Sequence, residues 1–139
     1  HCACVAINVK DETIVPQELV AWTDRAGLLG RSFFFDQTPA YGAALRAVSA
    51  HAAQPPVRTL ARASDRDEPL ADALRSPDWG VWLDAFDNDI FTAENIRLVH
   101  DAGKTAWIVS PELHGRTLDL AMLDQWREAD GICTDFPQL

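Results

Sequence analysis

The chain has 139 residues, 47% hydrophobic and 24% charged, with a formal net charge of -9 at pH 7. These values are typical of one acidic globular domain and exclude a disordered or fibrous chain. We do not expect a nucleic-acid partner, because the sequence shows no basic face that could neutralise phosphates. No apolar run approaches the ~18 residues that span a bilayer, so we expect no membrane span. Cys2, Cys4 and Cys133 have neither the spacing of a zinc site nor the even number typical of a disulfide framework, so we expect a reducing, cytoplasmic location.

Short apolar runs that end in polar residues alternate with amphipathic segments along the whole chain. We predict strands at residues 4–9, 32–35, 57–61, 79–83, 106–109 and 131–133, and helices at residues 16–26, 39–53, 70–74, 93–102 and 117–129. Pro16 and the Thr38-Pro39 pair are typical of a first helical turn, and Thr92 followed by Asn95 is typical of a helix start. Strict alternation predicts an α/β fold with a parallel sheet and right-handed crossovers.

Two architectures fit six such units. The length favours an open doubly wound sheet, because a complete (β/α)8 barrel typically needs about 250 residues. However, polar groups follow every strand instead of clustering at one switch point, and no glycine-rich turn follows the first strand. These two observations favour a parallel (β/α) barrel of TIM type.

Three short stretches resemble known motifs. Trp107-Ile108-Val109-Ser110 is similar to Trp-x-Val-Asn, Gly131-Ile132-Cys133-Thr134-Asp135-Phe136-Pro137 to Gly-Ile-x-Thr-Asp-x-Pro, and Ala6-Ile7-Asn8-Val9-Lys10 to a strand that contains Glu-Ile-Lys. These motifs belong to the seventh, eighth and an earlier strand of the glycerophosphodiester phosphodiesterase family and its phosphatidylinositol-phospholipase-C-like relatives, which are TIM barrels. The resemblance implies that residues 1–139 form one barrel domain, or its C-terminal part, that holds strands three to eight while the N-terminal strands are missing.

The resemblance also implies an activity and a cofactor, with one important departure. Family members hydrolyse glycerophosphodiesters, a reaction of lipid metabolism, to an alcohol and a glycerol phosphate with the help of a divalent cation such as Mg²⁺ or Ca²⁺. The family's catalytic His-Arg pair and its first metal ligands lie on strands one and two, which this sequence lacks. Its metal-binding Glu corresponds to Asn8, whose amide oxygen is a weaker ligand for a hard cation than a carboxylate.

The polar residues at the strand ends supply the candidate site. Asp84 lies among aromatic residues at the end of its strand, and His114 can carry a proton near neutral pH, so we predict both as catalytic residues. We predict Lys10, Arg62, Ser110, Arg116 and Trp107 as substrate or anion-binding residues, and Asn8 and Glu112 as metal ligands.

Several of these predictions have a structural alternative. Lys10 would begin an exposed loop, and Arg62 would lie in a solvated mixed-charge loop. Glu112 and Arg116 would pair with each other. Asp87 or Asp89 would cap the following helix.

The sequence leaves three functions open. The first is a phosphodiesterase-like domain that binds a small phosphodiester. The second is a non-catalytic phosphoryl-ligand binding or assembly domain that kept the barrel and lost the metal carboxylates, and the third is an open-sheet regulatory domain. In a six-unit barrel we expect a second copy of the chain, or the missing N-terminal segment, to cover the unpaired sheet edges.

Overall fold

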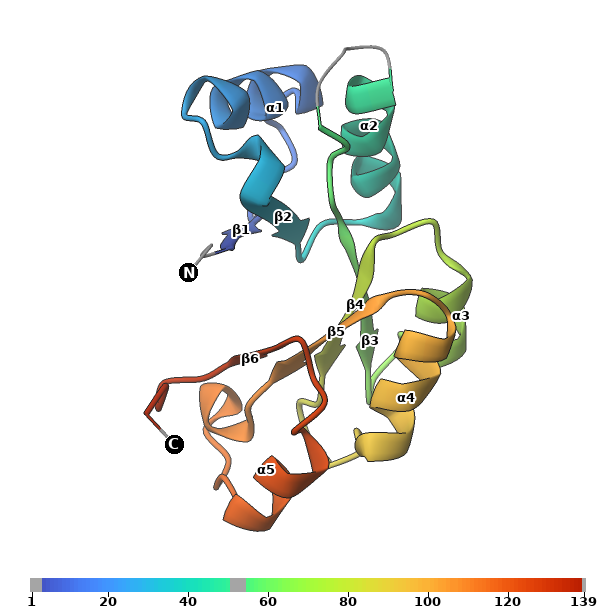
Figure 1. The fold of residues 1–139 in the computed structure, drawn as a ribbon, viewed down its shortest axis with the longest axis vertical. Helices are drawn as coiled ribbons and strands as arrows, with labels where there is room; N and C mark the ends of the chain where they lie inside the picture. Colours follow the sequence, from blue (N-terminus) through green and yellow to red (C-terminus); the bar gives the residue numbers. More distant parts are fainter. Residues whose placement is uncertain (1–3, 51–54, 139) are drawn as a thin grey trace. The chain divides into compact units, whose positions relative to one another are not determined.

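The computed structural model describes residues 4–50 and 55–138, in which parallel strands alternate with helices (Figure 1). The chain divides into two compact units, His1–Ala61 and Arg62–Leu139, and each is described by itself. Cys2 and residues 51–53 of the second predicted helix lie outside the described residues. Cys4 and Cys133 are free thiols.

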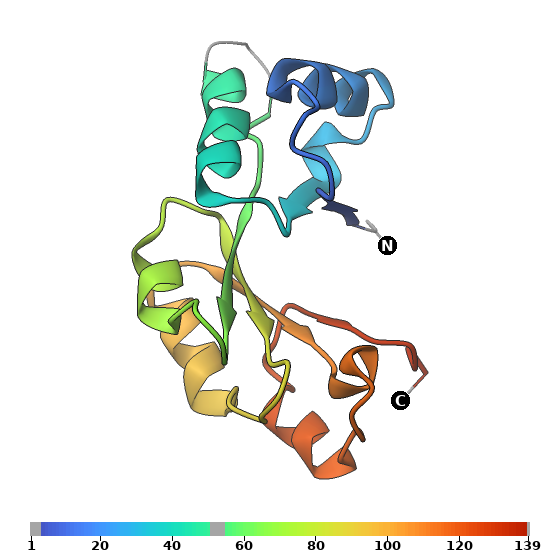
Figure 2. The same cartoon turned by 180° about the vertical axis from the view of Figure 1, so that it is seen from behind.

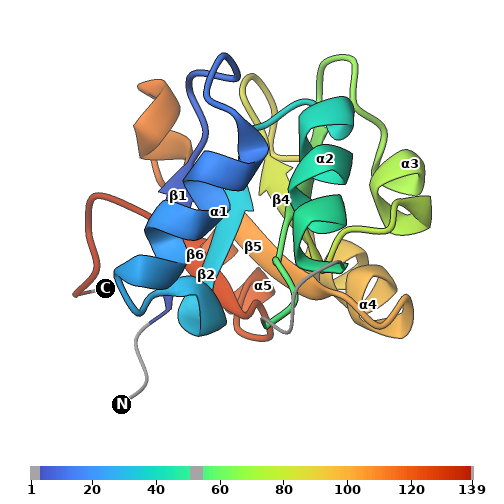
Figure 3. The ribbon, with the colours of Figure 1, turned by 90° about the horizontal axis from the view of Figure 1, so that it is seen from above.

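The first unit is built on a pair of parallel strands. β1 (Val5–Asn8) runs beside β2 (Ser32–Phe35), with Val5 opposite Ser32 and Asn8 opposite Phe35. The helices α1 (Pro16–Arg25) and α2 (Pro39–Ala50) lie side by side, and the short 3-10 helix η1 (Leu29–Arg31) precedes β2 (Figure 3).

An apolar cluster of buried side chains forms a core of the first unit. Its buried members come from both helices, from β2 and from the connecting segments: Val9, Val20, Leu29, Phe34, Tyr41, Leu45 and Val57. The Tyr41 hydroxyl donates to the carbonyl oxygen of Ile14 at 2.7 Å, which satisfies a polar group at the edge of this cluster. The predicted start of α2 is confirmed, because the Thr38 hydroxyl accepts from the N–H of Tyr41 at 3.3 Å.

The second unit contains a four-stranded sheet in the order β3-β4-β5-β6. Its strands are β3 (Leu60–Ser64), which begins at the end of the first unit, β4 (Gly80–Asp84), β5 (Thr105–Val109) and β6 (Gly131–Cys133). Its helices are α3 (Leu70–Arg75), α4 (Ala93–Asp101), α5 (Leu120–Gln125) and the 3-10 helix η2 (Pro111–His114). Figure 2 shows these elements from behind, with α4 alongside the sheet.

The register of the sheet decides which strand residues share a face. Trp82 of β4 lies opposite Trp107 of β5, and Asp84 lies opposite Val109. Because side chains alternate along a strand, Trp82 and Asp84 point to the same face. All five residues of β4 are buried, so Asp84 lies at the end of the most enclosed strand of this unit.

The structure confirms the six predicted strands and the alternation with five helices. The strand predicted at residues 57–61 instead spans Leu60–Ser64, and Thr59 before it forms an isolated parallel bridge to Phe34. The helix predicted at residues 117–129 is only Leu120–Gln125, and the Asp119 side chain caps its start by accepting from the N–H of Ala121 at 2.9 Å. Among the described residues, no helix has the length and apolar character needed to cross a bilayer.

Candidate functional site

Asp84 and His114 form the centre of the candidate site. Asp84 ends β4, and His114 ends η2, which follows β5. The His114 Nε2 lies 2.6 Å from the Asp84 Oδ1, and only 8% of the Asp84 side chain and 20% of the His114 side chain are exposed. Pro111 begins η2, and Gly115, with φ of 71°, ends it in the left-handed conformation that glycine adopts without strain. The structure therefore brings together the two residues that the sequence predicted separately as catalytic.

The Asp84–His114 contact constrains the protonation pattern of the imidazole. An ionised carboxylate can only accept hydrogen bonds, so beside an ionised Asp84 the Nε2 atom that faces it would carry the proton. In the neutral ring the lone pair then lies on Nδ1. A ring held in this way can take up or release a proton at Nδ1, while the carboxylate stabilises the imidazolium.

Asp65 organises the chain that follows Asp84, and the sequence prediction missed this role. Its carboxylate accepts from the backbone N–H groups of Phe86 at 2.9 Å, Asp87 at 2.8 Å and Asn88 at 2.7 Å. Partial burial raises the pKa of Asp65, but these N–H bonds outweigh that effect and lower the pKa to about 2. The Phe86 ring lies against the His114 ring, with 4.4 Å between the centroids.

Three arginines surround this centre, and each is paired with a carboxylate. The Arg62 Nε lies 2.7 Å from a Glu68 oxygen, and the Arg66 Nε lies 3.1 Å from an Asp87 oxygen. Arg66 also lies over the Phe86 ring, 4.3 Å from its centroid. The pKa of Arg66 is raised, chiefly by the hydrogen bond to Asp87.

Arg116 has two partners near the end of β4. It pairs with Asp89 and donates to the carbonyl oxygen of Ala85 at 3.0 Å. The helix-cap role considered for Asp89 is taken by Thr92 and Asn95, which form a reciprocal capping box at the start of α4. An anion would therefore have to compete with a carboxylate for Arg116, and anion binding by Arg62 and Arg116 stays a prediction.

Glu112 joins the ends of β5 and β6. It accepts from the hydroxyls of Ser110 and Thr134 and from the N–H of Asp135. Burial raises the pKa of Glu112, but the hydroxyl donors outweigh it, so that the pKa is lowered overall. The pairing of Glu112 with Arg116, considered from the sequence, does not form, and both Glu112 and the buried Ser110 serve as links between loops.

Trp107 belongs to the second unit, whereas Asn8 and Lys10 belong to the first unit. Trp107 packs in the middle of β5, with its Nε1–H donating to the Thr105 hydroxyl at 3.0 Å, so it is not at the strand end. In the first unit, Asn8 is exposed at the end of β1, and the exposed Lys10 pairs with Asp36.

The two predicted metal ligands, Asn8 and Glu112, offer different oxygen atoms to a cation. Both oxygens of Glu112 already accept hydrogen bonds, and Asn8 offers a neutral amide. Within residues 4–50 and 55–138, no three His, Cys, Asp or Glu residues converge as a metal would require. The roles of Asn8 and Glu112 as ligands of Mg²⁺ or Ca²⁺ therefore stay a prediction.

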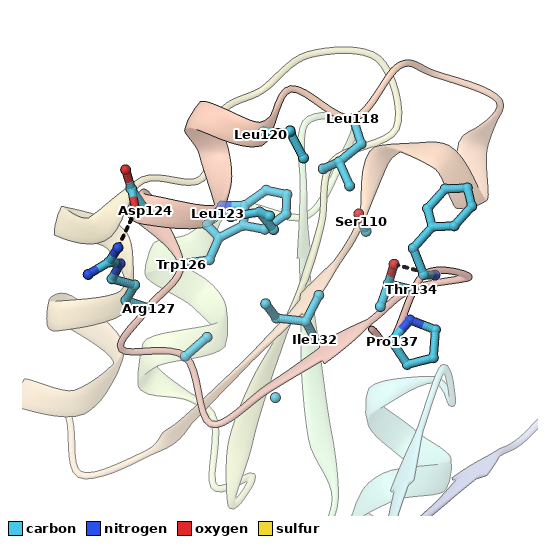
Figure 4. Close-up of a pocket in the computed structure, with 13 residues that line it drawn as sticks. Ser110, Leu118, Leu120, Leu123, Asp124, Trp126, Arg127, Ile132, Thr134 and Pro137 are labelled. Carbon is cyan, nitrogen blue, oxygen red and sulfur yellow. Dashed lines mark hydrogen bonds and ion pairs between the residues drawn. The ribbon is translucent and has the colours of Figure 1, made fainter. Parts of the chain in front are cut away.

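A separate hollow of about 680 Å³ lies beside α5 and β6 (Figure 4). Its walls are mainly apolar, with Leu120, Leu123, Trp126 and Ile132 among them. Ser110 and Thr134 also line it, whereas Asp84 and His114 do not. The hollow is therefore distinct from the candidate catalytic pair.

Comparison with known proteins supports the fold inferred from the three motifs. The chain resembles the crystal structure of a "putative glycerophosphodiester phosphodiesterase" from Galdieria sulphuraria, with a TM-score of 0.69 and 15% sequence identity. The match covers 96% of this chain and 54% of that one, so the chain spans about half the length of its structural neighbour. No protein-family model matches the chain, and no curated protein sequence matches it significantly.

At this low identity the comparison shows the fold alone. The α/β class with parallel strands is confirmed, and the arrangement corresponds to part of a TIM-type barrel. The resemblance to the phosphodiesterase family is thus supported by the fold, while the activity is a matter for proposal.

Proposed function

We propose that this chain is a phosphodiesterase-like domain in which Asp84 and His114 supply acid-base catalysis for the hydrolysis of a small phosphodiester, with glycerophosphodiesters as the first candidates. The observation that carries the proposal is the contact of 2.6 Å between the His114 Nε2 and the Asp84 Oδ1 at the carboxyl ends of parallel strands. Ligands of parallel α/β folds bind at that end of the strands.

The geometry defines a role for each side chain. Neutral His114 would accept a proton at Nδ1 from the attacking hydroxyl or water, and the imidazolium would return that proton to the leaving alkoxide. Asp84 would hold the ring and offset the positive charge. Arg62 and Arg116 would bind the phosphate oxygens once the ligand displaces Glu68 and Asp89, because guanidinium groups bind phosphates in a bidentate manner.

A hydrolysis assay with matched variants tests this proposal. The chain is incubated with glycerophosphodiesters and with an aryl phosphodiester, with Mg²⁺, with Ca²⁺ or with a chelator, and alcohol release is followed. We expect Asp84→Asn and His114→Gln to lower kcat by about 100-fold or more, which is the usual contribution of a general acid or base. His100→Gln and Asp101→Asn are the controls, because both residues lie on α4 outside the site, and they should retain full activity.

The outcomes separate the alternatives. Phosphodiester binding without hydrolysis under every metal condition would favour the non-catalytic binding domain. Hydrolysis that persists in His114→Gln would assign the chemistry to other residues. A cytoplasmic location, a place in lipid metabolism and assembly with a second copy belong to the same proposal and need separate measurements.

A further inference from the structure

We propose that Asp65 is a positioning residue for the Asp84–His114 pair, and that it acts through the turn at residues 86–88 and the ring of Phe86. Asp65 lies directly after β3, and this turn follows β4, so one carboxylate ties together the loops after two neighbouring strands. The effect of Asp65 on catalysis rests on the proposed function. The positioning of His114 by Asp65 can be tested without any activity.

The first step of the argument is the concentration of donors on one carboxylate. The N–H groups of Phe86, Asp87 and Asn88 all point at Asp65, and the side-chain amide of Asn88 adds a fourth donor at 3.3 Å. Hydrogen bonds to a charged acceptor are stronger than those between neutral groups. The turn is therefore fixed by a charge located 21 residues earlier in the chain.

The second step concerns the direction of the Phe86 side chain. Because the Phe86 N–H donates to Asp65, this hydrogen bond positions the Phe86 backbone and so sets the direction in which the Phe86 side chain leaves it. The ring contacts His114 at 4.4 Å between centroids and lies under the guanidinium of Arg66, 4.3 Å away. Arg66 is itself paired with Asp87 of the turn, so the turn supports both the ring and its cation.

The third step connects the ring to the catalytic pair. An imidazole can rotate about its side-chain bonds, and only a narrow range of orientations keeps Nε2 within hydrogen-bond distance of Asp84. Phe86 occupies space beside the imidazole and limits that rotation. Without this contact, a neutral His114 would exchange between its two tautomers and lose its alignment with Asp84. Small misalignments of catalytic groups lower the reaction rate strongly.

The ionisation of Asp65 keeps this support in place. With a pKa of about 2, the carboxylate is charged across the range in which an acid-base histidine works. Asp67, two residues later in the same loop, is exposed and provides a matched control for loss of one negative charge.

The test compares Asp65→Asn with Asp67→Asn and Phe86→Leu in the full chain. Long-range ¹H–¹⁵N correlation spectra report which nitrogen of His114 carries the proton, with the signal assigned through His114→Gln. Amide exchange reports the turn at residues 86–88. We expect the original chain and Asp67→Asn to show the Nε2–H form, and Asp65→Asn to show mixed tautomers together with exchange at least about tenfold faster in the turn.

Phe86→Leu keeps the backbone N–H groups that donate to Asp65 and isolates the contribution of the aromatic ring. It should show mixed tautomers with slow exchange, and it decides the question if Asp65→Asn fails to fold. Where the chain hydrolyses a phosphodiester, Asp65→Asn should lower kcat by about tenfold with little change in KM. An unchanged His114 tautomer in Phe86→Leu, or in a folded Asp65→Asn with a loosened turn, would overturn the inference. An inactive original chain would refute the proposed function, and the spectra would still decide the role of Asp65.

Discussion

His114 and Asp84 are 30 residues apart in the chain, yet their side chains meet with 2.6 Å between Nε2 and Oδ1. The contact depends on the parallel pairing of β4 with β5, which places Asp84 opposite Val109, shortly before η2. Both side chains are largely removed from water. A hydrogen bond in such a setting is strengthened by the low dielectric, and removal of one partner leaves a costly unpaired polar group.

We predict that Asp84 and His114 are energetically coupled. In a double-mutant cycle of Asp84→Asn and His114→Gln, urea unfolding should give a coupling free energy of about 1–3 kcal/mol. The more exposed His100–Asp130 pair, at 3.0 Å, is the matched comparison and should give less than about 1 kcal/mol. Strictly additive effects at Asp84 and His114 would mean that the contact contributes nothing to stability.

The hydrogen bonds from the N–H groups of residues 86–88 to the Asp65 carboxylate predict a specific loss of stability in acid. The pKa of Asp65 is lowered in the folded chain, to about 2 from an ordinary value of 3.8, so its contribution is complete above pH 3.8 and is lost as the pH falls towards 2. Urea unfolding of the original chain and of Asp65→Asn should therefore differ most near neutral pH and converge below about pH 2. A difference that stays constant with pH would contradict the lowered pKa.

Gly131 is predicted to be essential for packing β6. A Cβ atom at this position would clash with the ring of Trp107, far inside van der Waals contact. Gly131→Ala should destabilise the chain by about 1–3 kcal/mol, as overpacking commonly does, and thermal unfolding measures the change. Trp107→Leu should relieve part of that cost in the double variant, whereas an unchanged melting temperature in Gly131→Ala would show that the ring can move aside.

The predicted metal requirement can be tested at Asn8. The family resemblance implies a carboxylate at this position, and carboxylates bind Mg²⁺ and Ca²⁺ better than amides do. If Asn8 belongs to a metal site, Asn8→Asp should bind Ca²⁺ more tightly than the original chain by isothermal calorimetry, and a chelator should remove the gain in melting temperature. Gln17→Glu, at an exposed position of α1, is the control for an added charge, and equal affinities in both variants would remove Asn8 from the metal site.

Local signals in the sequence were sufficient for the order and type of the elements. Apolar runs of strand length, helical spacing and the helix-start signals at Pro16, Thr38 and Thr92 depend on neighbours in the chain, so they can be interpreted without a fold. The same signals misplaced the start of β3, which follows a bridge between Thr59 and Phe34, and the start of α5, which Asp119 caps. The residue types at Asp84 and His114 were also sufficient to name them as candidates.

The partners of those residues were decided by tertiary structure alone. Asp65 stood in a run of mixed charges that is commonly solvated, and nothing in the sequence indicates that its carboxylate meets three N–H groups more than 20 residues away. Glu112 has the residue type of a metal ligand, and only the structure shows that the hydroxyls of Ser110 and Thr134 donate to its oxygens. Sequence spacing determines which side chains are local neighbours on one element, whereas strand register determines which loops meet, and charged groups take the partners that the register brings within reach.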